Sequence, residues 1–127
     1  MKINLLTLLS FSAILSFVSL SEAAERENSG YSGSSEKGQQ LFLANCAECH
    51  QSNGQGLNNV YPALAGNETV LGSGADVALV LIIGRGEMPS FTGALSSEEM
   101  AAIINYVRNS WGNSGEMITA DAIEALQ

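Results

Sequence analysis

The sequence predicts an all-α protein, a small domain of three to five helices connected by long loops. Three observations lead to this prediction. Apolar residues in the segment 97–110 recur at the spacing of one face of a helix. Two glycine-rich stretches, at 51–74 and 84–94, predict loops between helices. No segment shows the alternation of apolar and polar residues that marks a half-buried strand, so a β-sheet is not expected.

The first 23 residues predict a secretory signal peptide. Lys2 is followed by an apolar run of sixteen residues, and Ser21 and Ala23 are small residues at positions −3 and −1 of a cleavage site. The run is shorter than the roughly 20 residues that span a membrane, and five of its residues are Ser or Thr, so a retained anchor is not expected. We expect cleavage after Ala23, a flexible lead-in over residues 24–34, and a mature protein in the periplasm.

The charge of the 127-residue chain excludes several classes of partner. Five Lys and Arg residues against thirteen Asp and Glu residues give a net charge of −8. So few basic side chains do not neutralise a row of nucleic-acid phosphates, and they do not attract an anionic membrane surface. We therefore expect protein partners, with no nucleic acid and no stable membrane insertion after cleavage.

A domain with a C-terminal tail is predicted for residues 35–127, and it begins with a helix over about 35–47. Ser34 is placed to cap this helix, and Glu36 lies in its first turn, where an acidic side chain is favourable. One face of the helix holds Gly38, Leu41, Phe42 and Asn45. The helix ends close to the two cysteines and the histidine of the chain.

The apolar run VALVLIIG at 77–84 is hydrophobic on all sides. Periodicity does not distinguish a buried strand from a short buried helix in such a run. We expect a helix from about Ala75 that ends at Gly84, because glycine commonly terminates helices.

The segment 97–110 gives the clearest helix of the chain. Ser96 with Glu99 three residues later forms a capping box, and Leu95 is placed to pack against Met100 across the first turn. Its buried stripe is predicted to consist of Met100, Ile103, Ile104, Val107 and Trp111. We expect Gly112 to end this helix, and a last short helix to follow Thr119.

The cysteines and the histidine lie in one short stretch. The two cysteines and the single histidine of the chain all belong to the segment Cys46-Ala47-Glu48-Cys49-His50. This C-x-x-C-H spacing is the signature of covalent haem attachment. Two thiols about one helical turn apart reach the two vinyl groups, and the next residue presents its imidazole to the iron. One such motif predicts one covalently attached haem c, with His50 as an iron ligand.

Redox, zinc and disulfide roles fit the motif less well than haem attachment does. A thioredoxin-type redox pair is expected in a βαβ setting, which the sequence lacks. A structural zinc site requires four ligands, and two cysteines with one histidine leave one missing. A disulfide between residues so close in sequence would constrain the unfolded chain very little. A chance match to the pattern is the remaining, trivial possibility.

The second axial position of the iron is not taken by a histidine, because His50 is the only histidine. The candidates are Met, Lys, Tyr, the chain amine, water or no ligand. Met100 belongs to the buried stripe and Met117 to the tail. Met88, in contrast, precedes Pro89 in a glycine-rich loop that is able to wrap closely around a cofactor. We therefore predict Met88 as the second axial ligand.

With these features the chain resembles the class I (mitochondrial-type) cytochromes c, of the small bacterial monohaem kind, over about residues 35–112. The resemblance rests on Gly38, Phe42, Cys46, Cys49 and His50, on Pro62-Ala63-Leu64, on Met88-Pro89, and on Ile103 and Tyr106. It implies a small cytochrome c fold in which the helices and long loops wrap around one covalent haem.

The resemblance also implies roles for single residues. The carbonyl of Pro62 would accept a hydrogen bond from the imidazole of His50 and fix its orientation. Leu64 would pack on the haem, and Met88 would be the axial methionine. Gly38 would lie where the first and last long helices cross, because a close crossing requires a residue without a side chain.

The function implied by the resemblance is electron transfer, not enzymatic catalysis. With His50 and Met88 on its two faces, the iron has no open position for a substrate. The expected carrier takes electrons from a dehydrogenase or quinol-oxidising complex and passes them to a terminal oxidase or reductase. The alternatives are a haem enzyme or a gas or peroxide sensor with a labile sixth ligand, and a tethered cytochrome subunit of one dehydrogenase.

Four further side chains complete the interpretation. Trp111 is expected in core or interface packing. Arg85 is a candidate partner of a haem propionate, with a solvated loop arginine as the equal alternative. Lys37 and Arg108 are expected to be surface charges.

Overall fold

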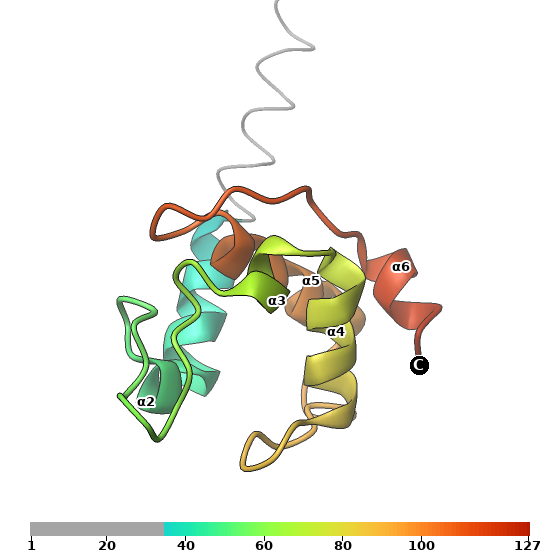
Figure 1. Ribbon diagram of the computed structural model, residues 1–127. Coiled ribbons are helices and arrows are strands. Elements are labelled where there is room, and N and C mark those ends of the chain that lie inside the picture. Colours follow the sequence, from blue (N-terminus) through green and yellow to red (C-terminus); the bar gives the residue numbers. More distant parts are fainter. Residues whose placement is uncertain (1–34) are drawn as a thin grey trace, which may run out of the picture. The chain divides into compact units, whose positions relative to one another are not determined.

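The structure, a computed structural model, describes residues 35–127. Its helices are a segment over residues 35–45 (the 35–45 helix), α2 (Ala47–His50), α3 (Glu68–Leu71), α4 (Gly74–Ile83), α5 (Ser97–Arg108) and α6 (Ala120–Glu124) (Figure 1). This part of the chain contains no strand, only three isolated bridges in loops, which confirms the all-α prediction. None of the helices in this range is long and apolar enough to cross a bilayer. The predicted signal peptide 1–23, the lead-in 24–34 and the cap at Ser34 lie outside the described residues.

Helix α5 is fixed at its start by the predicted capping box. The N–H of Glu99 donates to the Ser96 hydroxyl (3.2 Å), and the N–H of Ser96 donates to the Glu99 carboxylate (2.9 Å). This pair satisfies two N–H groups that have no partner within the helix. The predicted stripe is buried within the helix, with Met100 and Ile104 fully inaccessible to solvent, whereas Trp111 lies beyond the helix and is partly buried. The helix ends at Arg108 with Asn109 as its C-cap, so the predictions of an end near residue 110 and of Gly112 as the terminating residue are wrong.

Helix α4 shows that the apolar run is a helix and not a strand. At its start the N–H of Asp76 donates to the Ser73 hydroxyl (3.0 Å), and at its end Gly84 has a φ of 81°. One side of α4 faces the interior, whereas Ile83 at its last position is 70% exposed. The run is apolar on all sides, but the described chain covers only one of them.

Helix α3 lies in a stretch that the sequence predicts to be mostly loop. Its start is capped by Asn67, whose side-chain oxygen accepts hydrogen bonds from the N–H groups of Thr69 (3.0 Å) and Val70 (3.4 Å). Asparagine is common in loops and equally common as a helix cap. The asparagines of this stretch therefore do not reveal by themselves that a short helix follows.

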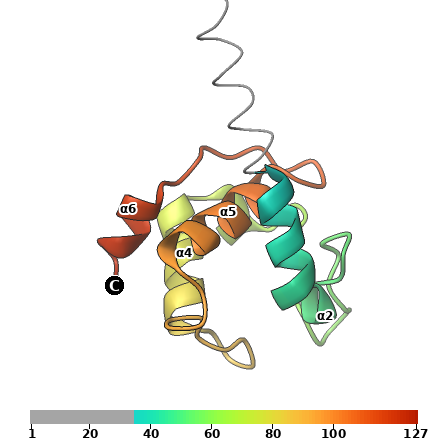
Figure 2. The ribbon, with the colours of Figure 1, turned by 180° about the vertical axis from the view of Figure 1, so that it is seen from behind.

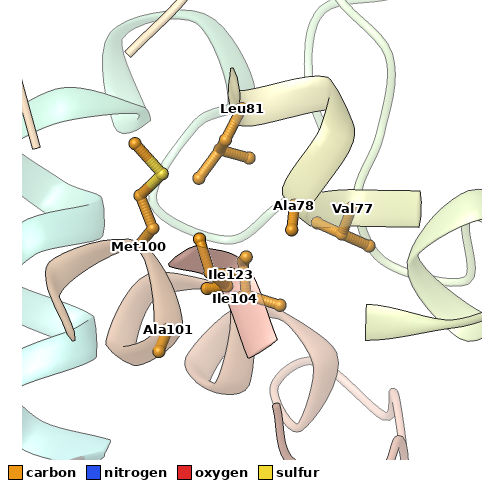
Figure 3. Close-up of a cluster of buried hydrophobic side chains, with 7 residues drawn as sticks. All are labelled: Val77, Ala78, Leu81, Met100, Ala101, Ile104 and Ile123. Carbon is orange, nitrogen blue, oxygen red and sulfur yellow. The ribbon is translucent and has the colours of Figure 1, made fainter. Parts of the chain in front are cut away.

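Two hydrophobic clusters form the interior, and α5 contributes to both. The first, called the Ile104 cluster, consists of Val77, Ala78, Leu81, Met100, Ala101, Ile104 and Ile123 from α4, α5 and α6 (Figure 3). The second, called the Phe42 cluster, consists of Phe42, Val70, Ile103 and Val107 from the 35–45 helix, α3 and α5. Leu95, just before α5, packs against both. Helix α5 thus lies between two separate parts of the core.

The 35–45 helix crosses α5 in close contact at Gly38 (Figure 2). A Cβ atom on Gly38 would overlap the backbone oxygen of Ala102 and lie 2.8 Å from the Cβ of Tyr106. The expectation that this crossing requires glycine is confirmed. Beside it, the rings of Phe42, Tyr106 and Trp111 pack against one another with centroids 5.2 to 5.6 Å apart. Trp111 therefore takes part in core packing, as predicted.

The prediction that Arg108 is a surface charge is wrong. Its side chain is 4% exposed, and its guanidinium donates to the carbonyls of Val70 (3.0 Å), Gly72 (2.5 Å) and Glu116. Two of these carbonyls lie at the C-terminal end of α3, where backbone acceptors lack helical partners and a positive charge is favourable. Arg108 therefore ties both α3 and the C-terminal tail to α5.

Replacing Arg108 with methionine is expected to lower the free energy of unfolding by about 2–4 kcal/mol, because three carbonyls lose their charged donor. Denaturant unfolding followed by circular dichroism measures this change. Lys37 is exposed and serves as the control, since Lys37→Met also removes one positive charge but uncovers no buried groups. Its unfolding midpoint should equal that of the parent. An unchanged midpoint for Arg108→Met would show that the buried guanidinium is not needed for stability.

Candidate functional site

The C-x-x-C-H motif begins at a bend after the 35–45 helix, at Cys46, and its other four residues form helix α2. The N–H of Cys46 donates to the carbonyl of Phe42 (2.8 Å), as in a continuing helix, and α2 then starts at Ala47. The N–H groups of Cys49 and His50 both donate to the carbonyl of Cys46 (3.2 and 2.9 Å). The predicted single helix is therefore interrupted at Cys46, and this bend orients the motif relative to the 35–45 helix.

The two cysteines of the motif are not joined by a disulfide, and both are of intermediate exposure. Burial, together with the neighbouring Cys49, raises the pKa of the Cys46 thiol to about 11. Redox-active C-x-x-C pairs have a lowered thiol pKa, so a thioredoxin-type role is not supported. Within residues 35–127, no three His, Cys, Asp or Glu side chains come together as a metal-ion site.

The imidazole of His50 is oriented by one hydrogen bond to a loop. The side chain is 8% exposed, and its Nδ1 lies 2.9 Å from the carbonyl oxygen of Pro62. Because a carbonyl only accepts, Nδ1 donates the proton of this hydrogen bond, and in the neutral imidazole Nε2 is then the nitrogen with the free lone pair. Metal-binding histidines commonly have this arrangement, with the second ring nitrogen oriented by a carbonyl. The contact that the resemblance implies between these two residues is therefore present in the structure.

The loop that follows His50 is closed by its own backbone. The N–H of Gly56 donates to the carbonyl of His50 (2.9 Å). The N–H groups of Leu64 and Ala65 both donate to the carbonyl of Gly54 (2.8 and 3.0 Å). Leu64 is partly buried and packs against the Phe42 cluster. The loop thus brings Pro62 and its close neighbour Leu64 to the side of the motif.

Asn113, for which the sequence predicts no role, also bonds this loop. Its side chain accepts from the N–H of Gly66 (2.8 Å) and donates to the carbonyls of Leu64 (3.1 Å) and Val107 (2.9 Å). No pattern marks such a residue, because its partners are backbone atoms distant in the sequence. The role of Asn113 is therefore recognised only in the folded chain.

Met88 lies in a tight turn that follows α4. The N–H of Arg85 donates to the carbonyl of Met88, and the N–H of Met88 donates to the carbonyl of Arg85, both over 3.0 Å. A Cβ atom on Gly84, at the start of the turn, would lie 2.7 Å from the carbonyl oxygen of Met88. Only glycine fits at this position, because its φ is also positive. Arg85 itself is exposed in this turn.

The chain beyond Met88 folds back onto the end of α4. The N–H of Phe91 donates to the carbonyl of Leu81 (2.8 Å). The hydroxyls of Ser90 and Thr92 both donate to the carbonyl of Ile82 (2.5 and 3.0 Å). These carbonyls belong to the last turn of the helix and have no helical partner. The contacts are not predicted from the sequence, although two hydroxyl residues close behind Met88 are a usable signal.

The three methionines of the described chain differ in their surroundings. Met100 is completely buried in the Ile104 cluster (Figure 3), in agreement with its predicted core role. Met117 lies in the tail and is 48% exposed. Met88 is partly buried and packs against the Ile104 cluster from its loop. Met88 therefore combines a loop position with partial burial, which neither of the others does.

The two parts of the site lie on separate arms of the domain. The arm of His50 comprises residues 46–66, and the arm of Met88 comprises residues 84–92. Helix α2 and the loop after α4 extend toward the same end of the described domain, on opposite sides of α5 (Figures 1 and 2). The structure joins His50 to Pro62 on one arm and places Met88 on the other. The donor set comprises two thiols, an imidazole with a free Nε2, a thioether and partly buried apolar side chains such as Leu64 and Phe91. This donor set fits a covalently attached haem.

Residues 33–107, more than half of the chain, match the family described as Cytochrome C oxidase, cbb3-type, subunit III. Over 107 residues the chain is 32% identical to cytochrome c-552 of Thermus thermophilus, covering 68% of this chain and 81% of that protein. Over 73 residues it is 38% identical to cytochrome c6 of Microcystis aeruginosa, covering 55% of this chain and 89% of that protein.

A second group of relatives consists of longer proteins. Over 109 residues the chain is 32% identical to the cytochrome c subunit of alcohol dehydrogenase (quinone) of Gluconobacter oxydans, covering 75% of this chain. The chain spans only 21–23% of the length of the alcohol dehydrogenase subunits that it matches. The similarity to these relatives therefore concerns one part of each of them.

The family match covers the motif, the loop with Pro62 and the turn with Met88. It therefore includes the residues predicted to hold the haem, whereas Asn113 lies beyond its end. The chain belongs to the family described as cytochrome c oxidase, cbb3-type, subunit III, and it is a small class I-like cytochrome c with covalently bound haem c.

Proposed function

We propose that the protein is a periplasmic carrier of single electrons with one haem c. The residues that would hold the haem are Cys46, Cys49, His50, Pro62, Leu64 and Met88. When bound, the haem iron supplies the redox chemistry by cycling between Fe(III) and Fe(II). The observation that carries the proposal is the hydrogen bond from Nδ1 of His50 to Pro62, because it leaves Nε2 free for the iron.

The two axial ligands have different tasks in this proposal. Pro62 keeps the imidazole of His50 in one tautomer and one orientation, which strengthens it as a donor. The thioether of Met88 favours the reduced iron and raises the midpoint potential. With side chains at both axial positions no position is open for a substrate or a gas. This favours an electron carrier over a haem enzyme or a sensor with a labile ligand.

The proposed partners are a dehydrogenase or quinol-oxidising complex as donor and a terminal oxidase or reductase as acceptor. Relatives named as cytochrome subunits of alcohol, gluconate and fructose dehydrogenases support a dehydrogenase as donor. The family description supports an oxidase as acceptor. Cytochromes c-552 and c6, matched over 81% and 89% of their own length, support a separate carrier over a tethered subunit. The predicted signal peptide supports the periplasm.

Replacing Met88 with alanine is expected to leave the haem attached and the domain folded, because the attachment residues lie on the other arm. The midpoint potential should fall by on the order of 0.1–0.3 V, since axial ligands set haem potentials over a span of about 0.8 V. The weak far-red absorption band of methionine-ligated Fe(III) should disappear. Potentiometric titration and visible spectra measure the two effects.

Two other methionines serve as controls for this variant. Met117 is exposed and Met100 lies in the Ile104 cluster, so Met117→Ala and Met100→Leu should both keep the parent spectrum. If Met88→Ala kept both the spectrum and the potential of the parent, the second ligand would have to be another residue.

The net charge of −8 should make the rate of electron transfer with charged partners depend on the salt concentration. Attraction accelerates encounter with a cationic partner and repulsion slows encounter with an anionic one, and salt screens both over about 8–10 Å. Oxidation of the reduced protein by a cationic cobalt complex should slow as ionic strength rises, while oxidation by ferricyanide should accelerate. Stopped-flow spectroscopy at several salt concentrations measures both rates.

Single acidic side chains show whether this charge acts close to the haem. Glu48 on α2 and Glu87 beside Met88 are exposed on the two arms, so Glu48→Gln and Glu87→Gln should flatten the salt dependence. Glu124 on α6 lies across α4 from α2 (Figures 1 and 2), and Glu124→Gln should change it less. Equal effects of all three substitutions would mean that only the total charge of the molecule matters.

A further inference from the structure

Asn113 is buried shortly after α5 and bonds three backbone groups. Its side chain is 7% exposed and uses both ends of its amide. Oδ1 accepts from the N–H of Gly66 (2.8 Å), and Nδ2 donates to the carbonyls of Leu64 (3.1 Å) and Val107 (2.9 Å). One side chain thus joins the end of the loop after His50 to the last turn of α5.

Trp111, two residues earlier, contacts the beginning of the same loop. A Cβ atom on Gly54 would lie 2.6 Å from atoms of the indole ring, so the backbone of Gly54 packs directly against it. The carbonyl of Gly54 accepts hydrogen bonds from the N–H groups of Leu64 and Ala65. Trp111 and Asn113 therefore hold the two ends of the loop segment 54–66 against each other.

Pro62 lies between these two ends and has no N–H with which to anchor its own backbone. Its carbonyl oxygen bonds Nδ1 of His50, and a Cβ atom on Gly56 would lie 2.6 Å from that oxygen. Before it, Leu57 and Tyr61 exchange backbone hydrogen bonds of 3.0 and 2.9 Å. The position of the Pro62 carbonyl therefore depends on how the neighbouring loop residues are held.

We propose that Asn113 is a positioning residue for His50. By holding Leu64 and Gly66, it keeps the carbonyl of Pro62 on Nδ1 of the imidazole. The proposal rests on the proposed function, in which Nε2 of His50 binds the haem iron. A well-directed hydrogen bond makes the imidazole a stronger donor and stabilises Fe(III). Without the contacts of Asn113 this hydrogen bond weakens, and the midpoint potential rises.

The test compares holoprotein carrying Asn113→Ala or Asn113→Asp with the parent. NMR of the reduced, diamagnetic protein measures how fast the Nδ1–H proton of His50 exchanges with solvent. We expect exchange roughly 10- to 100-fold faster in both variants, because several hydrogen bonds of buried groups are lost. The midpoint potential should be higher than that of the parent. Alanine leaves a cavity, whereas aspartate keeps the volume and the acceptor for Gly66 but places an acidic group beside the carbonyls of Leu64 and Val107. The two variants therefore disturb folding in different ways, and either one that folds carries the test.

Asn105 provides a matched control. It makes a similar pair of hydrogen bonds, donating to the carbonyl of Ile118 (2.9 Å) and accepting from its N–H (2.8 Å), but it holds the C-terminal tail. Asn105→Ala and Asn105→Asp should lose stability and keep the exchange rate and potential of the parent. Asn113 variants that match the Asn105 variants in both measurements would overturn the proposal and leave Asn113 a purely structural residue.

The parent protein separates this inference from the proposed function. The ring protons of an axial histidine are shifted strongly upfield by the haem ring current in the reduced protein. If the ring protons of His50 lack this shift in the parent, the proposed function is refuted and the inference with it. If the shift is present and the Asn113 variants behave like the Asn105 controls, only the inference is refuted.

Discussion

The two arms of the haem site are held in place by their contacts with a single helix, α5. Ile103 and Val107 pack toward the 35–45 helix, which leads into the C-x-x-C-H motif, whereas Met100 and Ile104 pack toward α4, which leads into the turn of Met88. One 12-residue helix with a capped start therefore sets the distance between the arms. The close crossing at Gly38 belongs to the same constraint, because any side chain there would push the motif away from α5.

Polar side chains that bond backbone groups hold the loops of this small domain. Arg108 bonds the end of α3, Asn113 bonds the loop after His50, and Asn105 bonds the tail at Ile118. Glycine-rich loops bury few side chains, so the hydrophobic effect alone orders them weakly. A buried amide or guanidinium satisfies several carbonyls at once, and its removal leaves all of them without partners. Order in the loop after His50 and in the tail therefore depends on a few residues outside them.

The parts of the fold that follow from local sequence are those whose determinants are neighbours in the chain. The capping box of Ser96 and Glu99 and the apolar stripe of α5 predict that helix correctly. The motif at Cys46 and the loop position of Met88 point to the haem in the same way. The resemblance adds the contact between His50 and Pro62, twelve residues apart.

The parts that do not follow from the sequence involve backbone partners far away. Arg108 reaches a carbonyl 38 residues earlier and Asn113 one 49 residues earlier. Every residue has a backbone carbonyl, so the sequence does not indicate which carbonyl will accept a hydrogen bond from a given charged or polar side chain. For the same reason Arg108, at the end of a predicted helix, is expected from the sequence to be a surface charge. Such residues are identified only when the fold brings the carbonyls together.

The proposed electron transfer would explain why both arms are anchored by several contacts. Transfer of one electron breaks no bond, so the ligands serve best when they keep the same place in both oxidation states. The arm of His50 is held by Trp111 and Asn113 from the chain after α5, whereas the turn of Met88 is closed by its own backbone and by hydroxyls bonded to α4. The two anchors share no residue. In the proposed function, substitutions on one arm would therefore tune one axial ligand while α5 keeps the other in place.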